Sequence, residues 1–152
     1  MAGHVIEINL ASQKGEPTVS HDQAQVVAGQ GLAGDRKWRD LAPNEATVYH
    51  RQITLIEQEQ VQHFNEVYGA SMTPAETRRN VVTKGIALND LVDRQFSVGT
   101  VRMRGTMLCE PCKYLQKLTG LPVVEGYLHR GGLCAEILND GVINVGDQIV
   151  CD

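Results

Sequence analysis

The feature that most constrains the fold of this chain is a succession of short segments with alternating apolar and polar residues, separated by turn signals. In residues 4–10, the side chains of Ile6, Ile8 and Leu10 recur with the period of two that is typical of a half-buried strand. The sequence predicts further strands at residues 25–28, 52–56, 80–83, 96–98, 100–108, 133–138 and 148–151. Turn signals at Asp140-Gly141 and Gly146-Asp147 separate the last two.

Helical patterns are few and short. The strand predicted at residues 52–56 continues into a helix in which Val61, Phe64 and Val67 or Tyr68 recur at helical spacing. Residues 73–76 have the sequence of a helix start, with Thr as N-cap, Pro in the first turn and Glu three residues after Thr. Residues 113–118 form another helical stretch.

Many closely spaced short strands with minor helices predict a mainly β fold, an antiparallel β-barrel with two or three short helices. A doubly wound fold is excluded because strands do not alternate regularly with long helices. The chain has 152 residues and contains no internal repeat, charge block or low-complexity stretch. We therefore expect residues 1–152 to form a single domain.

The composition excludes several functional classes. With 42% hydrophobic and 21% charged residues, the chain can bury a core and is not disordered. Its net charge of −4 and aromatic content of 5% disfavour binding to nucleic acid or to an anionic membrane. No leader pattern and no apolar run of about 20 residues is present, so a cytoplasmic protein with free cysteines is expected.

Residues 29–34, Gly-Gln-Gly-Leu-Ala-Gly, match the pattern of a dinucleotide-binding loop literally. That pattern binds pyrophosphate only where the loop opens a helix, and residues 35–40 show no apolar helical periodicity. An acidic residue at the end of a following strand is also missing. We interpret the segment as a glycine-rich turn within a charged loop that extends over residues 29–47.

Cys109-Glu110-Pro111-Cys112 is the most informative tetrapeptide, because it lies between a predicted strand and the helical stretch at residues 113–118. A thiol near a helix N-terminus is stabilised as thiolate, which favours Cys112 as a reactive thiolate or soft-metal ligand. A zinc site would need a second close pair of ligands, and a thioredoxin-like dithiol would need a βαβ context. Neither is evident, and two ordinary turn cysteines remain an alternative. Cys134 and Cys151 lie in apolar strand patterns and are predicted to be buried and inert.

Arginines are concentrated in loops and beside glycines, and guanidinium groups suit phosphate and other oxyanions. As a set flanking the cysteine turn they predict a pocket for an anionic cofactor, although each arginine alone is better explained by a surface role. The set comprises Arg36, Arg51, Arg78, Arg79 and Arg130. Arg130 belongs to the turn His129-Arg130-Gly131-Gly132, whose backbone N–H groups are suited to anion binding.

Taken in order, the motifs of this chain resemble those of the MOSC domain, which occurs at the C-terminus of molybdenum-cofactor sulfurases and as a stand-alone bacterial protein. The matching motifs are GLAGDR at residues 31–36 with Trp38, RQ at 51–52, TRRN at 77–80, FSVG at 96–99, CEPC at 109–112 and GVINVGD at 141–147. They span nearly the whole chain, and their order makes the set specific.

The resemblance implies a MOSC-type β-barrel in which Cys112 is the functional cysteine, either ligating molybdenum or carrying sulfur. By similarity to amidoxime-reducing members of the family, Arg36, Arg78 and Asn80 would hold the phosphate and pterin of molybdopterin. Lys14 and Ser12 in the first loop, together with Arg130, are further candidates for cofactor binding. No pyridoxal-phosphate site is expected on this chain.

Three functions follow from these expectations. The first is a molybdenum-dependent, two-electron reductase of N-hydroxylated compounds that takes electrons from an external donor. The second is a sulfur carrier in which Cys112 receives a persulfide from a cysteine desulfurase. The third is a non-catalytic module that binds the cofactor.

Overall fold

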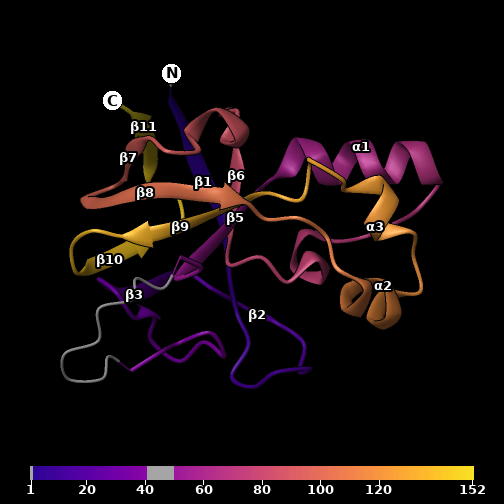
Figure 1. The fold of residues 1–152 in the computed structure, drawn as a ribbon, viewed down its shortest axis with the longest axis horizontal. Helices are drawn as coiled ribbons and strands as arrows, with labels where there is room; N and C mark the ends of the chain where they lie inside the picture. The colour runs from indigo at the N-terminus through magenta and orange to yellow at the C-terminus, as the bar shows by residue number, and fades with distance from the viewer. Residues whose placement is uncertain (1, 41–49) are drawn as a thin grey trace.

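The computed structural model describes residues 2–40 and 50–152 and consists of a β-barrel with helices packed along one side (Figure 1). The strands are β1 (Ala2–Leu10), β2 (Val19–His21), β3 (Gln23–Val27), β4 (Gly31–Leu32), β5 (Ile53–Glu57), β6 (Val81–Lys84), β7 (Gln95–Val98), β8 (Val101–Leu108), β9 (Leu133–Ile137), β10 (Gly141–Asn144) and β11 (Gln148–Cys151). The helices are α1 (Gln58–Tyr68), α2 (Lys113–Thr119) and α3 (Val123–Gly126), with single 3₁₀ turns η1 (Pro74–Thr77) and η2 (Leu88–Leu91).

Within the described residues, seven strands close the barrel in the order β11-β7-β8-β9-β5-β6-β1, and β1 pairs back onto β11. β2 extends the sheet beyond β1. Closure leaves these strands without a free edge, which removes a common site of aggregation. The predicted mainly β barrel with short helices is therefore confirmed.

The barrel is mixed, because β5 and β6 run parallel while the other adjacent pairs are antiparallel. The reason is the connection between them: α1 and η1 carry the chain back to the end at which β5 began. A parallel pair needs such a crossover, whereas antiparallel neighbours need only a turn. The sequence showed the strand and helix at residues 52–68 but did not predict this pairing.

The glycine-rich segment at residues 29–34 contains the short strand β4, which joins a separate sheet of order β10-β3-β4. Turns and bends follow it through residue 40, and no helix begins there. Its interpretation as a turn is confirmed for this part. The end of the predicted loop, residues 41–47, lies outside the described residues.

The barrel interior is filled by alternate residues of its strands. In β8, Val101 and Met103 are fully buried, while Arg102 and Arg104 share the partly exposed outer face as the sequence predicted. A second apolar cluster lies outside the barrel, between the sheet and the helices. Its centre is Phe64 of α1, which stacks on Tyr127 with ring centroids 4.6 Å apart.

The helix start predicted at Thr73 is present, with a capping box between Thr73 and Glu76, but the helix is only one 3₁₀ turn. This turn ends at Arg78, which has the left-handed backbone conformation, with φ of 63°. The chain then enters β6 at once. None of the helices among the described residues is long and apolar enough to span a bilayer.

Candidate functional site

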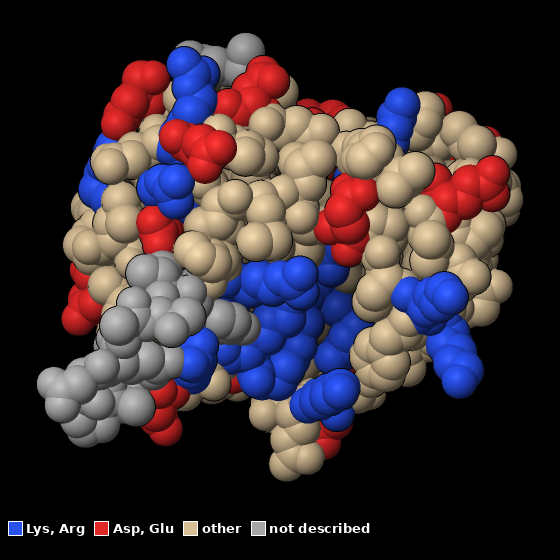
Figure 2. Space-filling view, in the orientation of Figure 1, with Lys and Arg blue, Asp and Glu red and all other residues tan. Residues whose placement is uncertain are grey.

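A cavity of about 290 Å³ lies where the loop after β1, the turn at residues 35–37, the end of η1 and the start of α2 meet. It is lined by Lys14, Arg36, Lys37, Thr77, Arg78, Arg79, Cys112, Tyr114 and Leu115. Figure 2 shows Lys and Arg side chains gathered in the lower middle of this face, between the barrel and the helical layer. A chain with a negative net charge thus has one strongly cationic surface.

Asp35 organises one wall of the cavity. Its buried carboxylate accepts hydrogen bonds from the backbone N–H of Ala11 at 3.1 Å and from that of Lys37 at 3.2 Å. It also accepts one from Arg36 at 3.0 Å, and Arg36 donates a further bond to the carbonyl of Arg78 at 2.8 Å. Arg36 is therefore fixed in place, with part of its charge offset by Asp35.

Arg78 connects the cavity to the first loop, because its guanidinium donates a hydrogen bond to the carbonyl of Glu16. Burial lowers the pKa of Arg78, and the nearby charge of Arg36 lowers it further. Two guanidinium groups held this close favour an anion between or beside them.

Arg79 braces the cysteine turn. Its side chain is largely buried and donates to the carbonyl of Gly131 at 2.8 Å, to that of Cys109 at 3.1 Å and to that of Glu110 at 3.4 Å. These bonds join the loop before α2 to the glycine turn before β9. The position of Cys112 therefore depends on Arg79.

Lys37 lies between the cavity and the interior. Burial lowers its pKa, the thiol of Cys109 raises it, and the charges of Arg36 and Arg79 lower it again. A desolvated ammonium group of this kind gains more from a bound anion than an exposed lysine does.

Cys112 is exposed and lies at the rim of the cavity, one residue before α2. The helix begins where the sequence predicted, although it has only seven residues. Next to Cys112, the Tyr114 ring receives the ammonium group of Lys14, whose Nζ is 5.8 Å from the ring centroid. This cation–π contact closes the cavity on the side of the first loop.

The two cysteines of the turn have different surroundings. Cys109 is buried and follows β8, where its N–H donates to the carbonyl of Gly132 at 2.7 Å. A hydrogen bond with the thiol of Cys134 lowers the pKa of Cys109, and the charges of Arg79 and Lys37 lower it further against the opposing effect of burial. The same hydrogen bond, with burial, raises the pKa of Cys134. The sequence led us to expect the activated thiol at Cys112 and to regard Cys134 as inert.

The cavity brings together Cys112, Arg36, Arg78 and Lys14 from the residues predicted for the site. Asn80 is adjacent in sequence but fully buried, and its side chain is bonded to Thr54 and to the carbonyl of Asn9. Two other predicted residues are exposed and outside the lining: Ser12 bonds Glu16 at 2.8 Å, and Arg130 bonds Gln60 at 3.3 Å.

Sequence reasoning did not single out Lys37, Thr77 or Tyr114, which also line the cavity. Lys37 follows directly after the GLAGDR motif, and Thr77 is the first residue of the TRRN motif. These motifs indicated the region of the site but gave no reason to select these two residues. Tyr114 carries no such signal, because a tyrosine in a helical stretch is more often a packing residue.

The chain belongs to the MOSC domain family, whose model matches residues 19–150. No curated protein sequence matches the chain. Among solved structures, it is similar to the YuaD protein from Bacillus subtilis, with a TM-score of 0.84, 18% identity and coverage of 98% of this chain and 94% of YuaD.

It is also similar to YiiM from Geobacillus stearothermophilus, with a TM-score of 0.77, 18% identity and coverage of 99% and 75% of the two chains. For YiiM from Escherichia coli the TM-score is 0.71, the identity 15% and the coverage 100% and 70%. At these identities the likeness establishes the shared fold. The family itself is associated with the molybdenum cofactor.

Proposed function

We propose that this chain binds molybdenum cofactor in the cationic cavity, with Cys112 as the protein ligand of the metal, and reduces N-hydroxylated compounds. The observation that carries the proposal is the coincidence of an exposed thiol with a group of Lys and Arg side chains around one cavity of about 290 Å³. Thiolate is a suitable ligand for a soft, sulfur-rich metal centre. The cations suit the phosphate of the pterin cofactor.

The residues present fit this group by charge and by chemistry. Arg36 and Arg78 both line the cavity, and Arg36 also donates to the backbone carbonyl of Arg78, so both side chains are available to one phosphate. Lys14 and Lys37 approach the same cavity from the first loop and from the turn after β4. The apolar side chain of Leu115 and the ring of Tyr114 offer surface to a flat heterocycle.

When bound, the cofactor supplies the two-electron redox centre. Arg36 and Arg78 would hold the phosphate, and Arg79 would keep Cys112 in position through its bonds to the cysteine turn. Removal of the oxygen of an N-hydroxyl group consumes two electrons and two protons and releases water. The electrons must come from an external donor. Burial lowers the pKa of Lys37, so its ammonium group is a candidate proton donor to the departing oxygen.

The experiment is metal analysis of protein purified from a host able to make molybdopterin and from one that is not. We expect molybdenum near one per chain in the first case and folded, metal-free protein in the second. Cys112→Ala should lose the metal and the reduction of N-hydroxylated substrates by an artificial reductant, whereas Cys151→Ala should keep both. Stoichiometric zinc, or full metal retention by Cys112→Ala, would contradict the proposal. Metal without activity would favour a non-catalytic binding module.

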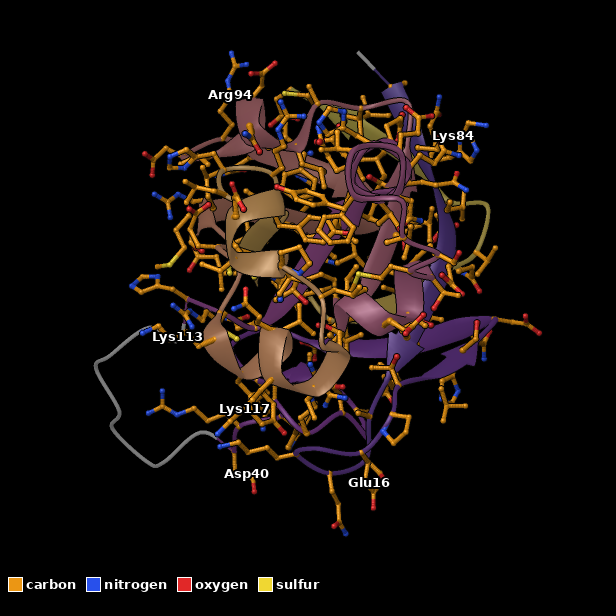
Figure 3. The ribbon with its side chains drawn as sticks, turned by 90° about the vertical axis from the view of Figure 1, so that its right-hand side faces the viewer. Glu16, Asp40, Lys84, Arg94, Lys113 and Lys117 are labelled. Atoms are coloured by element: carbon orange, nitrogen blue, oxygen red, sulfur yellow. The ribbon has the colours of Figure 1, made fainter. Side chains whose placement is uncertain are left out.

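A second function, sulfur transfer, is favoured by the exposure of Cys112 beside Lys113 and Lys117, which extend the cationic surface along α2 (Figure 3). In that case Cys112 would attack the persulfide of a cysteine desulfurase and take over its terminal sulfur, releasing the donor thiolate. Incubation with a desulfurase should then add one sulfur mass to Cys112 that dithiothreitol removes. Loading that is unaffected by Arg78→Ala, in protein without reductase activity, would favour the carrier over the reductase.

A further inference from the structure

The structure assigns a second thiol site to this chain: we propose that Cys109 and Cys134 form a redox-active dithiol that closes reversibly to a disulfide beneath the cationic cavity. This site is separate from Cys112 and does not depend on which cofactor the cavity holds. It rests on the sheet register, on the burial of both thiols and on the cations around them.

The register places the two residues on one face of the sheet. Met107 of β8 is opposite Cys134 of β9, and the ladder continues to the bond from Cys109 N–H to the carbonyl of Gly132. Cys109 and Cys134 are thus diagonal neighbours, whose side chains can meet. Leu133 and Ala135 belong to the barrel core. Because successive side chains of a strand point to opposite faces, Cys134 between them points to the outer face of the barrel.

The turn itself argues against a disulfide between Cys109 and Cys112. Cys112 is exposed at the cavity rim, whereas Cys109 is buried against β9 and is held there by the bond to Gly132. Cys109 directly follows β8, in the turn that leads to α2, so disulfide closure requires movement of this turn toward β9 and not of the paired strands.

The surroundings favour chemistry at Cys109. The hydrogen bond with the thiol of Cys134 lowers the pKa of Cys109, and the charges of Arg79 and Lys37 lower it further, against the opposing effect of burial. A lowered pKa favours Cys109 as the attacking sulfur, whereas the raised pKa of Cys134 keeps its thiol protonated. Cations that stabilise the reduced form also make the corresponding disulfide more readily reducible.

A peroxide is the class of oxidant that completes the reaction. The Cys109 thiolate attacks the O–O bond of hydrogen peroxide, becomes a sulfenic acid and releases hydroxide, which is protonated to water. The sulfur of Cys134 then attacks the sulfenic sulfur, an S–S bond forms, and a second water leaves with the proton of Cys134. Two thiols thus lose two electrons, and the peroxide becomes two water molecules.

Closure changes the charge below the cavity. When Cys109 is a thiolate, its negative charge offsets Lys37 and Arg79, both of which also line the cavity. The disulfide is neutral, so these cations become available to an anion above them. We expect the affinity for inorganic pyrophosphate to rise by about threefold or more at low ionic strength, since such interactions are screened by salt.

The test uses the full chain carrying Cys112→Ser and Cys151→Ser, in which Cys109 and Cys134 are the remaining thiols. Treatment of the folded protein with hydrogen peroxide should remove both thiols, lower the mass by two hydrogens and yield a linked peptide pair containing both cysteines. Dithiothreitol should restore the thiols. A matched variant that also carries Cys109→Ser should form no intramolecular disulfide.

Persistence of both thiols at peroxide concentrations that oxidise free cysteine would overturn the site. In the wild-type chain, a linkage from Cys109 to Cys112 instead of Cys134 would do the same. Pyrophosphate affinity is measured by calorimetry on the reduced and oxidised forms of the Cys112→Ser, Cys151→Ser chain. Equal affinities would refute the coupling to the cavity.

Discussion

At the scale of single residues, the site depends on buried polar side chains whose hydrogen bonds hold the surrounding loops in place. Asp35 holds the turn that carries Arg36 and Lys37, and Arg79 holds the turn that carries Cys112. Asn80 joins β1, β5 and β6. Buried polar groups of this kind stabilise a fold only when their partners are present.

Replacing Asn80 by alanine should destabilise the protein by about 3 kcal/mol, since the Thr54 N–H and the Asn9 carbonyl would lose their partner inside the protein. Denaturant unfolding measures this change. Asn89→Ala, at an exposed position that bonds the His129 carbonyl, is the matched control and should cost less than about 1 kcal/mol. Similar losses of unfolding free energy in the two variants would show that the buried hydrogen bonds of Asn80 do not stabilise the fold more than an exposed one does.

Asn9 presents the opposite case. It is fully buried, and its side-chain oxygen and nitrogen have no hydrogen-bond partner among residues 2–40 and 50–152. Because an unpaired buried amide costs about 1–3 kcal/mol, Asn9→Leu should raise the free energy of unfolding. A loss of stability in Asn9→Leu would indicate that the amide has a partner, such as an internal water.

Arg78→Ala should weaken the binding of inorganic pyrophosphate by about tenfold, in line with the loss of one charge-assisted hydrogen bond. Calorimetry at low salt measures the affinity. Arg94→Ala removes the same charge from an exposed position at the opposite end of the molecule from Lys117 (Figure 3) and should leave the affinity unchanged. Equal affinities in both variants would remove Arg78 from the anion site.

At the scale of elements, the predictable parts were those with enough residues to show a period. The alternation in β1 and β8 and the helical spacing of Val61 and Phe64 in α1 each follow from one buried face. β2, β4 and β10 were not predicted: all of β2 is exposed, β4 has two residues within a glycine-rich turn, and β10 lies among turn signals with a single buried residue. These strands are defined by backbone pairing, because none of them shows an alternation of buried and exposed side chains long enough to be recognised in the sequence.

The junction of β5 and α1 carries a carboxylate with a raised pKa. Glu57 is half-buried and accepts from the Leu88 N–H at 3.4 Å; burial raises the pKa of Glu57, with Glu59 and Asp90 adding to the effect. Above pH 4.5 the unfolded chain loses this proton before the folded protein does, so stability falls as pH rises through the folded pKa.

Glu57→Gln should therefore be more stable than the wild type at pH 7 and equal to it near pH 4. Thermal unfolding across this pH range measures the difference. Glu66→Gln makes the same charge change on the exposed surface of α1 and is expected to show no such pH-dependent gain. A gain in Glu66→Gln as large as that in Glu57→Gln would assign the effect to net charge instead of burial.

The turn before β9 depends on a glycine. Gly132 has φ of +108°, and a Cβ there would lie 1.9 Å from the carbonyl oxygen of Leu55. Gly34 has φ of +84° with nothing within 4 Å of the corresponding position. Gly34→Ala should cost only the conformational strain, about 1–2 kcal/mol. Gly132→Ala should lower the free energy of unfolding clearly more, because the backbone around Leu55 must also move. Equal losses in the two variants, measured by denaturant unfolding, would contradict the steric argument.

At the scale of the whole molecule, the motifs predicted which residues lie close together but not how they are arranged. Arg36, Arg78 and Cys112 were predicted from motifs, and the fold brings them to one cavity. The pairing of Cys109 with Cys134 depends on the register of β8 and β9, a contact between residues 25 positions apart that no local pattern encodes. The burial of Asn80 likewise depends on strands from three parts of the chain.

The protein has two apolar clusters of unequal size. The larger fills the closed barrel, and the smaller, around Phe64, holds α1, α2 and α3 against its outside (Figure 1). A small cluster outside a closed sheet should open without unfolding the barrel. Amides of α2 and α3 should therefore exchange with solvent faster than those of β8 and β9.

Phe64→Leu should accelerate amide exchange in α1 and α3 by about tenfold while changing the barrel strands less, since it removes the stacking on Tyr127. Phe96→Leu, inside the barrel, should instead accelerate exchange throughout the chain. Uniform acceleration in both variants would show a single cooperative unit. Because Leu115 ties α2 to the Phe64 cluster, separate opening of this layer would also move Cys112 relative to Arg36 and Arg78. The cavity could then open toward a ligand while the barrel stays closed.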